Sequence, residues 1–382
     1  MPNTQDPIET FRASFKKNEL HHFNNAGVAP TSRQAREAVE HWVKRFSEEG
    51  THCIADAVAM SERTRDVLGR VLGAESNQIA FFQSSAAGLS QVAFGLKLNP
   101  GDEIITWDQE YPSNFHPWRL ACERSGAKLV VAQSGENFST PIDAIKAVIT
   151  SRTKLIAFSW VQYRTGAIAD IGAVCEMARA KNILTCSDII QGAGILPFDF
   201  EKSGLDFACG GSHKWFVSPV SSGYLIARKD RIDQLSPLMV GAASFGGPDS
   251  LPSDTTLVAG ALRFEPGSRA FLELAGFGAS LEMIEKVGIA RIGQEVEWLS
   301  KRLMHGLREI GYAIHSPHGS HYRGSIVNFA PTQQSAAKSA EAIHHRLNEA
   351  KVSFGKRQPG VRLAPHAFNT AEEIDLILAC LR

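Results

Sequence analysis

Lys214 is the residue whose surroundings first suggest covalent chemistry. The strand-like residues 206–211 end in two glycines, and Ser212, His213, Lys214 and two bulky aromatic residues follow. A lysine between glycines and aromatics is expected in a cleft, where desolvation of the amine lowers its pKa. Such an amine is a nucleophile that forms Schiff bases. Taken singly, a lysine is more often a surface residue that lays its apolar stem along the protein.

Asp188 ends a second strand-like segment, residues 182–188. A buried aspartate needs a charged partner, and the pyridinium nitrogen of pyridoxal phosphate is one such partner. The alternative is an aspartate that caps the next helix or turn. Gln191 lies three residues further on and has an amide able to donate to a phenolate oxygen. The order of strand, Asp188, Gln191, glycines, strand and Lys214 is more specific than any of these residues alone.

Small residues begin a helix pattern after the strand-like residues 78–82. Backbone N–H groups at a helix start bind phosphate, and small side chains let the phosphate approach. The alternative is an ordinary capped helix. The residues concerned are Ser84, Ser85, Ala86 and Ala87. Tyr111, which follows the strand-like residues 102–107, is placed to stack on a cofactor ring, unless it only forms part of a turn with Pro112.

The elements that must position these residues alternate between strand and helix patterns. This alternation predicts βαβ units and a mostly parallel, seven-stranded sheet between layers of helices, with the last strand antiparallel. Polar residues at the strand ends are then expected at one edge of the sheet. The predicted strands are 78–82, 102–107, 128–132, 154–160, 182–188, 206–211 and 223–228, and the predicted helices between them are 89–98, 116–126, 141–151 and 172–182.

The pattern changes after residue 250. A helix is expected over 33–49, and a long helix over 269–310 with a break at Gly288. Short strands near 313–317, 325–331 and 351–355, with helices over 335–350 and 370–381, indicate a smaller C-terminal α+β domain. We therefore expect a large domain over residues 19–250, a small domain over 251–382, and residues 1–18 packed near the small domain.

Composition excludes several classes of protein. The 382 residues hold 40 Lys and Arg against 40 Asp and Glu, which speaks against binding to nucleic acid or to a membrane surface. Six scattered cysteines without a Cys-x-x-Cys pair, and no visible secretion signal, indicate a cytoplasmic protein. His315, His318 and His321 fit a polar loop better than a metal site, so no metal is expected.

Longer motifs give the chain a family resemblance. It resembles the class V aminotransferases, the fold-type I pyridoxal-phosphate group that includes cysteine desulfurases and selenocysteine lyases. The resemblance covers residues 20–382. The motifs that carry it are FNNAGVAPTSRQA, EYPSN, SWVQYRTGAIADI, SDIIQGAGILPFD, GGSHKWFVSPVSSGYL, LRFEPGS and VRLAPHAFNTAEEID.

The resemblance implies a pyridoxal-phosphate enzyme in which Lys214 forms the internal aldimine and moves the Cα proton. It implies a catalytic set of Lys214, Asp188 and His213. It implies that Arg362, Asn25 and Gln162 bind the amino-acid substrate, with Arg362 on the α-carboxylate. The implied cofactor-binding residues are Ser85, Ala86, Ala87, Tyr111, Gln162, Asp188, Gln191, Ser212, His213, Lys214 and Ser268. Because Ser268 matches a residue that reaches the partner subunit's phosphate, a homodimer with shared active sites is expected.

Several functions stay open within this family. Residues 331–362 contain no cysteine, whereas the desulfurases of the family carry a nucleophilic cysteine there, so a persulfide-forming enzyme is disfavoured. We expect an aminotransferase, with a C–S lyase or an amino-acid epimerase as alternatives. A non-catalytic binding protein is disfavoured by the presence of Lys214 and Asp188. A short-chain dehydrogenase, suggested by NNAG at 24–27, lacks its Tyr-x-x-x-Lys pair.

Overall fold

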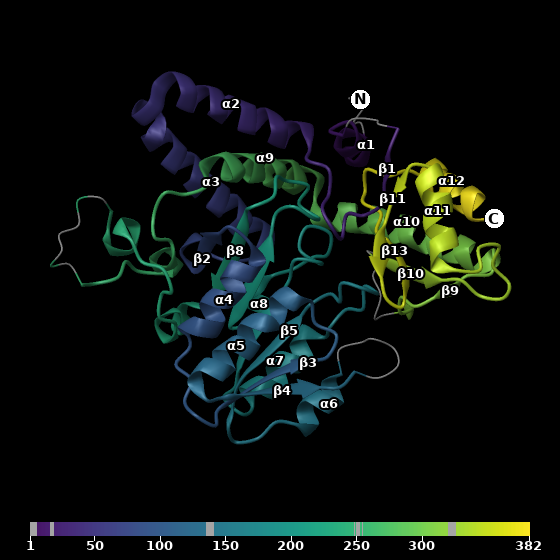
Figure 1. Cartoon of the computed structure of the whole chain (residues 1–382). Coiled ribbons are helices and arrows are strands. Elements are labelled where there is room, and N and C mark those ends of the chain that lie inside the picture. The colour runs from purple at the N-terminus through teal and green to yellow at the C-terminus, as the bar shows by residue number, and fades with distance from the viewer. Residues whose placement is uncertain are drawn as a thin grey trace.

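A seven-stranded sheet lies at the centre of the protein (Figure 1). The computed structural model describes residues 6–15, 19–134, 141–247, 249, 253, 255–319 and 326–382. The sheet has the order β2-β8-β7-β6-β5-β3-β4, and only β8 runs antiparallel to its neighbours. The predicted sheet and its antiparallel strand are therefore confirmed. The strands are β2 (Ile79–Phe82), β3 (Glu103–Trp107), β4 (Lys128–Ala132), β5 (Thr153–Ser159), β6 (Leu184–Asp188), β7 (Phe207–Gly211) and β8 (Gly223–Ala227).

Helices cover both faces of this sheet. The strands are apolar on both sides, because neighbouring residues of a strand point to opposite faces. In β5, Leu155 and Ala157 belong to the core under α4 and α5, whereas Ile156 and Phe158 belong to the core under α3, α7 and α9. These helices are α3 (Ile54–Leu72), α4 (Ser85–Gly95), α5 (His116–Ser125), α7 (Ile171–Arg179) and α9 (Phe271–Val287); α6 (Ile142–Ala147) and α8 (Phe200–Ser203) are shorter.

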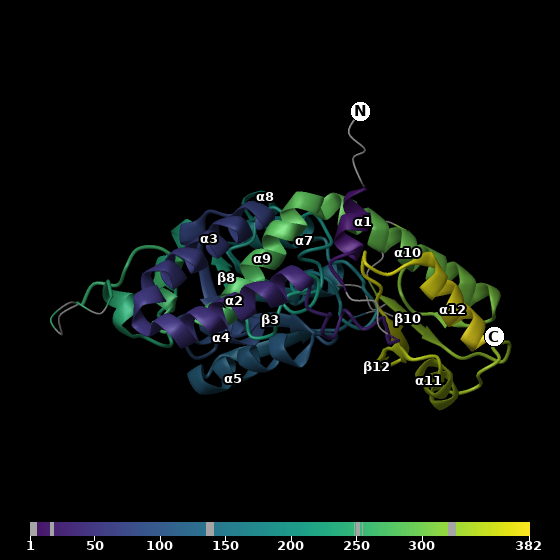
Figure 2. The same ribbon diagram turned by 90° about the horizontal axis from the view of Figure 1, so that it is seen from above.

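A second, antiparallel sheet lies in the C-terminal part, beside the large sheet (Figure 2). Its order is β12-β13-β10-β9, and a separate pair, β1-β11, is parallel. A core of its own lies between this sheet and three helices. The elements are β1 (His21–His22), β9 (Ala313–Ile314), β10 (Val327–Ala330), β11 (Val352–Ser353), β12 (Gly355–Arg357), β13 (Gly360–Leu363), α10 (Ile289–Glu309), α11 (Ala340–Glu349) and α12 (Ala371–Leu381).

Helix α10 connects the two cores. Its first half places Ile292 and Val296 in the large core, and its second half places Leu299 and Leu303 in the C-terminal core. The predicted long helix does break at Gly288, whose φ of +88° favours glycine. One continuous apolar face thus fixes the position of the small sheet relative to the large one. The exact domain boundary at residue 250 stays a prediction.

The N-terminal helices pack across the same region. Helix α1 (Pro7–Arg12) is joined to the C-terminal half by Arg12, which pairs with Glu295 at 2.7 Å and donates to the Asn369 carbonyl at 3.3 Å. Helix α2 (Arg33–Glu49) has the predicted bounds and is capped by the Ser32 hydroxyl. Within the described part of the chain, no helix is long and apolar enough to cross a membrane.

Candidate active site

The candidate catalytic residues meet at the carboxyl edge of the large sheet. Asp188 is the last residue of β6, where it pairs with Ser159 of β5 and Cys209 of β7. Two residues beyond Cys209, β7 ends, and the chain turns into the segment that carries Lys214. Because parallel strands end at one edge, residues far apart in sequence become neighbours there. The geometry therefore places Asp188 and Lys214 in one site.

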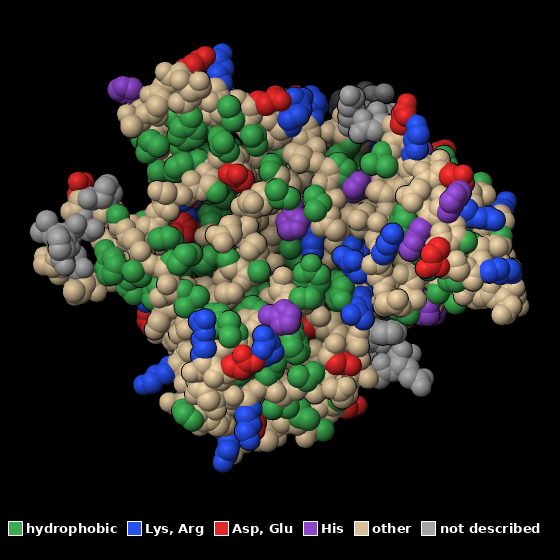
Figure 3. Space-filling model, viewed as in Figure 1, with side chains coloured by type: hydrophobic (Ala, Val, Ile, Leu, Met, Phe, Trp, Pro, Cys, Tyr) green, Lys and Arg blue, Asp and Glu red, His purple; other side chains and the backbone are tan. Residues whose placement is uncertain are grey.

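Lys214 has the surroundings of a reactive amine. Burial lowers its pKa from 10.5 to about 8, assisted by the positive charges of Arg362 and Arg357 and opposed by Asp188. Its Nζ lies 5.7 Å from the centre of the Tyr111 ring. No hydrogen bond or ion pair from described residues holds the amine. On the face of the molecule seen in Figure 3, Lys and Arg side chains gather at the centre, between the part built on the large sheet and the C-terminal elements.

Asp188 is a buried carboxylate without an ion pair among the described residues. Its Oδ1 accepts one hydrogen bond, from the Ile190 backbone N–H at 3.0 Å. Burial raises the pKa of Asp188, while that hydrogen bond and the charge of Lys214 lower it. An uncompensated buried carboxylate is costly. The site therefore favours a cationic group placed next to Asp188.

The start of α4 presents backbone donors close to β8. Ser84 caps the helix by accepting from the Ala87 N–H at 3.2 Å, and the Ser85 and Ala86 N–H groups precede the first possible intrahelical acceptor. Gly223 allows this approach, because a Cβ there would lie 2.2 Å from the Ser84 carbonyl carbon. These donors and the helix dipole form a cradle suited to phosphate.

Arg362 is a buried guanidinium held only by neutral groups. It extends from β13, where Nη1 donates to the Tyr163 carbonyl at 2.7 Å and Nη2 donates to Asn24 Oδ1 at 3.1 Å. Its Nε is buried and has no partner. Burial and the charge of Arg357 lower the pKa of Arg362 to about 9. An anion that pairs with this fork would relieve that cost.

Two predicted ligand-binding amides already have partners within the protein. Gln191 donates to the Ala26 carbonyl and accepts from Trp215 Nε1, both at 3.0 Å. Gln162 Oε1 accepts from the backbone N–H groups of the next loop, and its Nε2 donates to the Gln109 carbonyl at 3.2 Å. Gln191 retains one N–H, whereas Gln162 mainly shapes its own loop. Their contacts with cofactor or substrate stay predictions.

Two further predicted residues are fixed by backbone contacts. The Ser212 hydroxyl donates to the Pro219 carbonyl at 2.7 Å, which leaves its oxygen only as an acceptor. Asn25 donates to the Ala364 carbonyl at 2.8 Å, and its buried Oδ1 has no partner. Both side chains therefore position the segments on either side of the site. A direct ligand contact stays a prediction for each.

His213 and Tyr111 border Lys214. Burial and the adjacent Lys214 lower the pKa of His213 to about 4, so its imidazole is neutral at physiological pH. The Tyr111 ring is 39% exposed and meets Tyr163 edge-on, with 5.0 Å between ring centres. An exposed aromatic face beside a reactive amine is suited to stacking on a planar ring.

Ser268 has no hydrogen bond, ion pair or ring contact with the candidate catalytic residues in the described part of the chain. It is exposed, with a positive φ of 46°, and the neighbouring Arg269 pairs with Glu62 at 2.5 Å and Glu265 at 2.9 Å. No contact among the described residues joins Ser268 to Lys214. The role of Ser268 stays a prediction.

The structure adds site residues that the sequence did not single out. Asn24 and Tyr163 hold Arg362, and the charge of Arg357 acts on both Arg362 and Lys214. Each lies inside or next to a motif already noted, but a motif does not reveal which side chain turns inward. His321, by contrast, lies outside the described residues.

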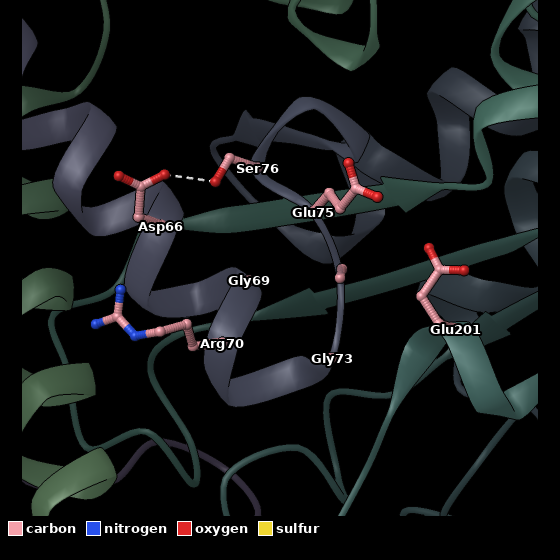
Figure 4. A pocket seen from close by; sticks show the side chains of 8 residues that line it. Asp66, Gly69, Arg70, Gly73, Glu75, Ser76 and Glu201 are labelled. Carbon is pink, nitrogen blue, oxygen red and sulfur yellow. Dashed lines mark hydrogen bonds between the residues drawn. The ribbon is translucent and has the colours of Figure 1, made fainter.

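A hollow lies between α3, the turn that follows it and α8 (Figure 4). Its volume is about 630 Å³, and Asp66, Glu75 and Glu201 line it. Ser76 donates to Asp66 at 2.5 Å, and Glu75 pairs with Lys229. Asp66 and Glu75 thus have partners in the protein, and none of the residues that line this hollow is a candidate catalytic residue.

Known proteins resemble the chain over nearly its whole length. The family model described as aminotransferase class-V matches residues 22–376. The chain is 26% identical to the uncharacterized aminotransferase YcbU of Bacillus subtilis over 92% of this chain and 89% of that protein. It is 26% identical to isopenicillin N epimerase of Streptomyces clavuligerus, with 94% and 93% covered.

A solved structure has the same fold. The apo cysteine desulfurase from Thermococcus onnurineus NA1 superposes with a TM-score of 0.88 at 22% identity, covering 99% of this chain and 98% of that one. The match of the family model, together with the lysine and aspartate at the carboxyl edge of the sheet, gives the chain its family. The protein belongs to the class V aminotransferases, and it is an enzyme that depends on pyridoxal phosphate.

Proposed function

We propose that the enzyme acts on the amino group of an α-amino acid and that its main reaction is transamination. The observation that carries this proposal is Lys214, a buried amine with a pKa of about 8 on which the charges of the Asp188 carboxylate and the Arg362 guanidinium both act. The arrangement joins a nucleophile, an anchor for a cationic ring and an anchor for a carboxylate in one site. An amino acid and pyridoxal phosphate need these three features.

The residues present fit pyridoxal phosphate. Asp188 lacks a cationic partner and would hold the ring nitrogen, while Ser85 and the backbone donors at the start of α4 would hold the phosphate. Lys214 would attach to the aldehyde, with Tyr111 over the ring. When bound, the cofactor supplies an electron sink that stabilises negative charge at the α-carbon of the amino acid.

The chain supplies binding and proton transfer. Arg362 would pair with the α-carboxylate, which fixes the orientation of the Cα–H bond. Lys214 would accept the Cα proton, because a pKa near 8 leaves a useful fraction of the amine neutral at physiological pH. The neutral imidazole of His213 would border the ring without adding another charge beside Lys214.

Cysteine placement bears on the competing reactions. Cys380 lies in α12 against the small core, and burial raises the pKa of its thiol. Since residues 331–362 also lack cysteine, a persulfide-forming desulfurase is disfavoured. A C–S lyase or an epimerase shares the same early steps and is the second candidate; isopenicillin N epimerase is among the relatives.

We also propose a homodimer with shared active sites. Ser268 is exposed, as expected for a residue that serves a partner. Large apolar side chains that remain exposed support a buried face in the assembly. They include Val43, Ile54, Val58, Val220, Leu238, Met239 and Val240. The six free cysteines support a cytoplasmic location.

Borohydride reduction of the purified protein with pyridoxal phosphate tests the attachment. Peptide mass mapping should find the reduced cofactor on Lys214, and Lys214→Arg should abolish the label while Lys202→Arg leaves it unchanged. A screen of amino acids then separates the reactions: a keto acid with pyridoxamine phosphate indicates transamination, pyruvate with sulfide a lyase, and exchange with racemisation an epimerase. Absence of any label on Lys214 would refute the proposal.

A further inference from the structure

Two more arginines border the site beyond Arg362. Arg164 is half-buried; its Nε donates to the Tyr163 hydroxyl at 2.7 Å, and its guanidinium lies 5.3 Å from the centre of the Tyr163 ring. Arg357 is also half-buried, and its Nε is buried without a partner. Tyr163 is the residue whose carbonyl holds Arg362. Arg164 and Arg362 are thus attached to the same residue.

Asn328 fixes the two arginine-bearing segments to each other. Its Nδ2 donates to the Arg164 carbonyl at 3.2 Å and to the Arg357 carbonyl at 3.0 Å. One amide therefore joins the loop after β5 to the end of β12. The charge of Arg357 acts on both Arg362 and Lys214, so Arg357 lies near both of them.

None of these three arginines pairs with a carboxylate among the residues that the structure describes. The contrast is the fully buried Arg65, which pairs with Glu265 at 2.6 Å. Like charges held together without counter-ions disfavour the folded state. A cluster of this kind is retained where a ligand supplies the missing negative charge.

The positive charges of Arg164, Arg357 and Arg362 outnumber the single α-carboxylate of an amino acid. Asp188 is the acid that acts on Lys214, and the phosphate cradle is made by the start of α4. One α-carboxylate would pair with Arg362, and Arg164 and Arg357 would remain uncompensated. We propose that Arg164 and Arg357 form a second anion-binding subsite that selects amino acids whose side chain ends in a carboxylate. This inference rests on the proposed function and names its substrate class.

Calorimetric titration of the cofactor-loaded protein tests the subsite without turnover. The probes are two pairs of equal chain length, succinate with butyrate and glutarate with valerate. At least one dicarboxylate should bind about tenfold or more tightly than its monocarboxylate, the lower end of what a charge-assisted hydrogen bond contributes. A ratio near one for both pairs would overturn the subsite.

Matched variants show which residues produce the ratio. Arg164→Gln and Arg357→Gln should each bring the ratio of dicarboxylate to monocarboxylate affinity toward one. Arg357→Lys, which keeps the charge, should retain most of this ratio. Lys356→Gln is the control, since Lys356 is exposed and adjacent on β12. If Lys356→Gln lowers the ratio as much as Arg357→Gln, the effect is general charge and the subsite is refuted. Thermal unfolding confirms that each variant is folded.

Turnover gives an independent comparison. The wild-type enzyme should prefer L-glutamate or L-aspartate to its amide by kcat/KM, and Arg164→Gln should remove that preference mainly through KM. Equal use of acid and amide refutes the subsite but leaves the proposed function intact. Conversely, absence of the reduced cofactor on Lys214 refutes the proposed function, while the dicarboxylate ratio, measured then on the protein without cofactor, still decides the subsite.

Discussion

The reactivity of Lys214 with pH gives the sharpest test of the site. With a pKa of about 8, about half of the Lys214 amines are neutral at pH 8. At the ordinary value of 10.5 the neutral fraction would be about 0.3%. Burial should therefore raise the supply of reactive amine about 150-fold at this pH.

Reductive methylation of the cofactor-free protein measures this directly. Formaldehyde and cyanoborohydride are applied at a series of pH values, and peptide mass spectrometry follows each lysine. Lys214 should reach half of its maximal rate near pH 8. Lys202 is an internal reference, because its ion pair with Asp199 raises its pKa and should delay its labelling to higher pH.

Two variants should move the midpoint of Lys214 in opposite directions. Arg362→Gln removes a like charge, so the pKa of Lys214 should rise toward its ordinary value. Asp188→Asn removes an opposite charge, so the pKa should fall further. A wild-type midpoint with the ordinary lysine value, or shifts of the same sign in both variants, would refute the electrostatic account.

Three further predictions follow from individual contacts. Arg362→Gln should weaken amino-acid binding far more than cofactor binding, measured by titration of each; equal losses would count against the carboxylate clamp. Gly223→Ala places a Cβ 2.2 Å from the Ser84 carbonyl carbon and should lower both cofactor affinity and Tm, while Gly172→Ala on α7, where the new Cβ meets only Asp170 Oδ1 at 3.4 Å, should lower neither. Burial raises the pKa of Glu110 from 4.5 to about 7. The free energy of unfolding should therefore fall by about 3 kcal/mol as pH rises through this range, because the folded state holds the Glu110 proton more tightly than the unfolded state. Glu110→Gln should flatten that slope in urea unfolding at pH 5 and 7.5, and an unchanged slope would assign it to other groups.

Local patterns predicted most of the fold. Strands such as β5 are short apolar runs between turn signals, and α2 begins at a serine cap, so their bounds could be read from the sequence. Helix α3 was not predicted, because its polar residues include Thr64 and the buried Arg65. Arg65 is compensated by Glu265, which lies 200 residues away in the chain. Only the tertiary structure reveals such a pairing.

The site was predictable where chemistry requires one residue type at a strand end. Lys214 and Asp188 stand out for that reason, and the fold brings them together. Whether a side-chain amide contacts a ligand or the protein itself cannot be inferred in the same way. Gln162 and Gln191 have the expected residue type, but their partners are backbone groups of loops that come close only in the folded chain. Arg164 was not singled out, because the sequence does not show that it lacks a carboxylate partner.

The zero net charge of the chain conceals an uneven distribution that follows from function. Elsewhere in the described chain, arginines such as Arg302 pair with nearby carboxylates, here Asp375 at 2.7 Å. Around Lys214 the positive charges lack such partners, and they add to burial, the larger cause, in lowering the pKa of the amine that the chemistry requires. A bound anion reverses this effect, because it neutralises the arginines and raises the pKa of Lys214. Substrate binding would thus make Lys214 a stronger base at the moment when the Cα proton must be removed.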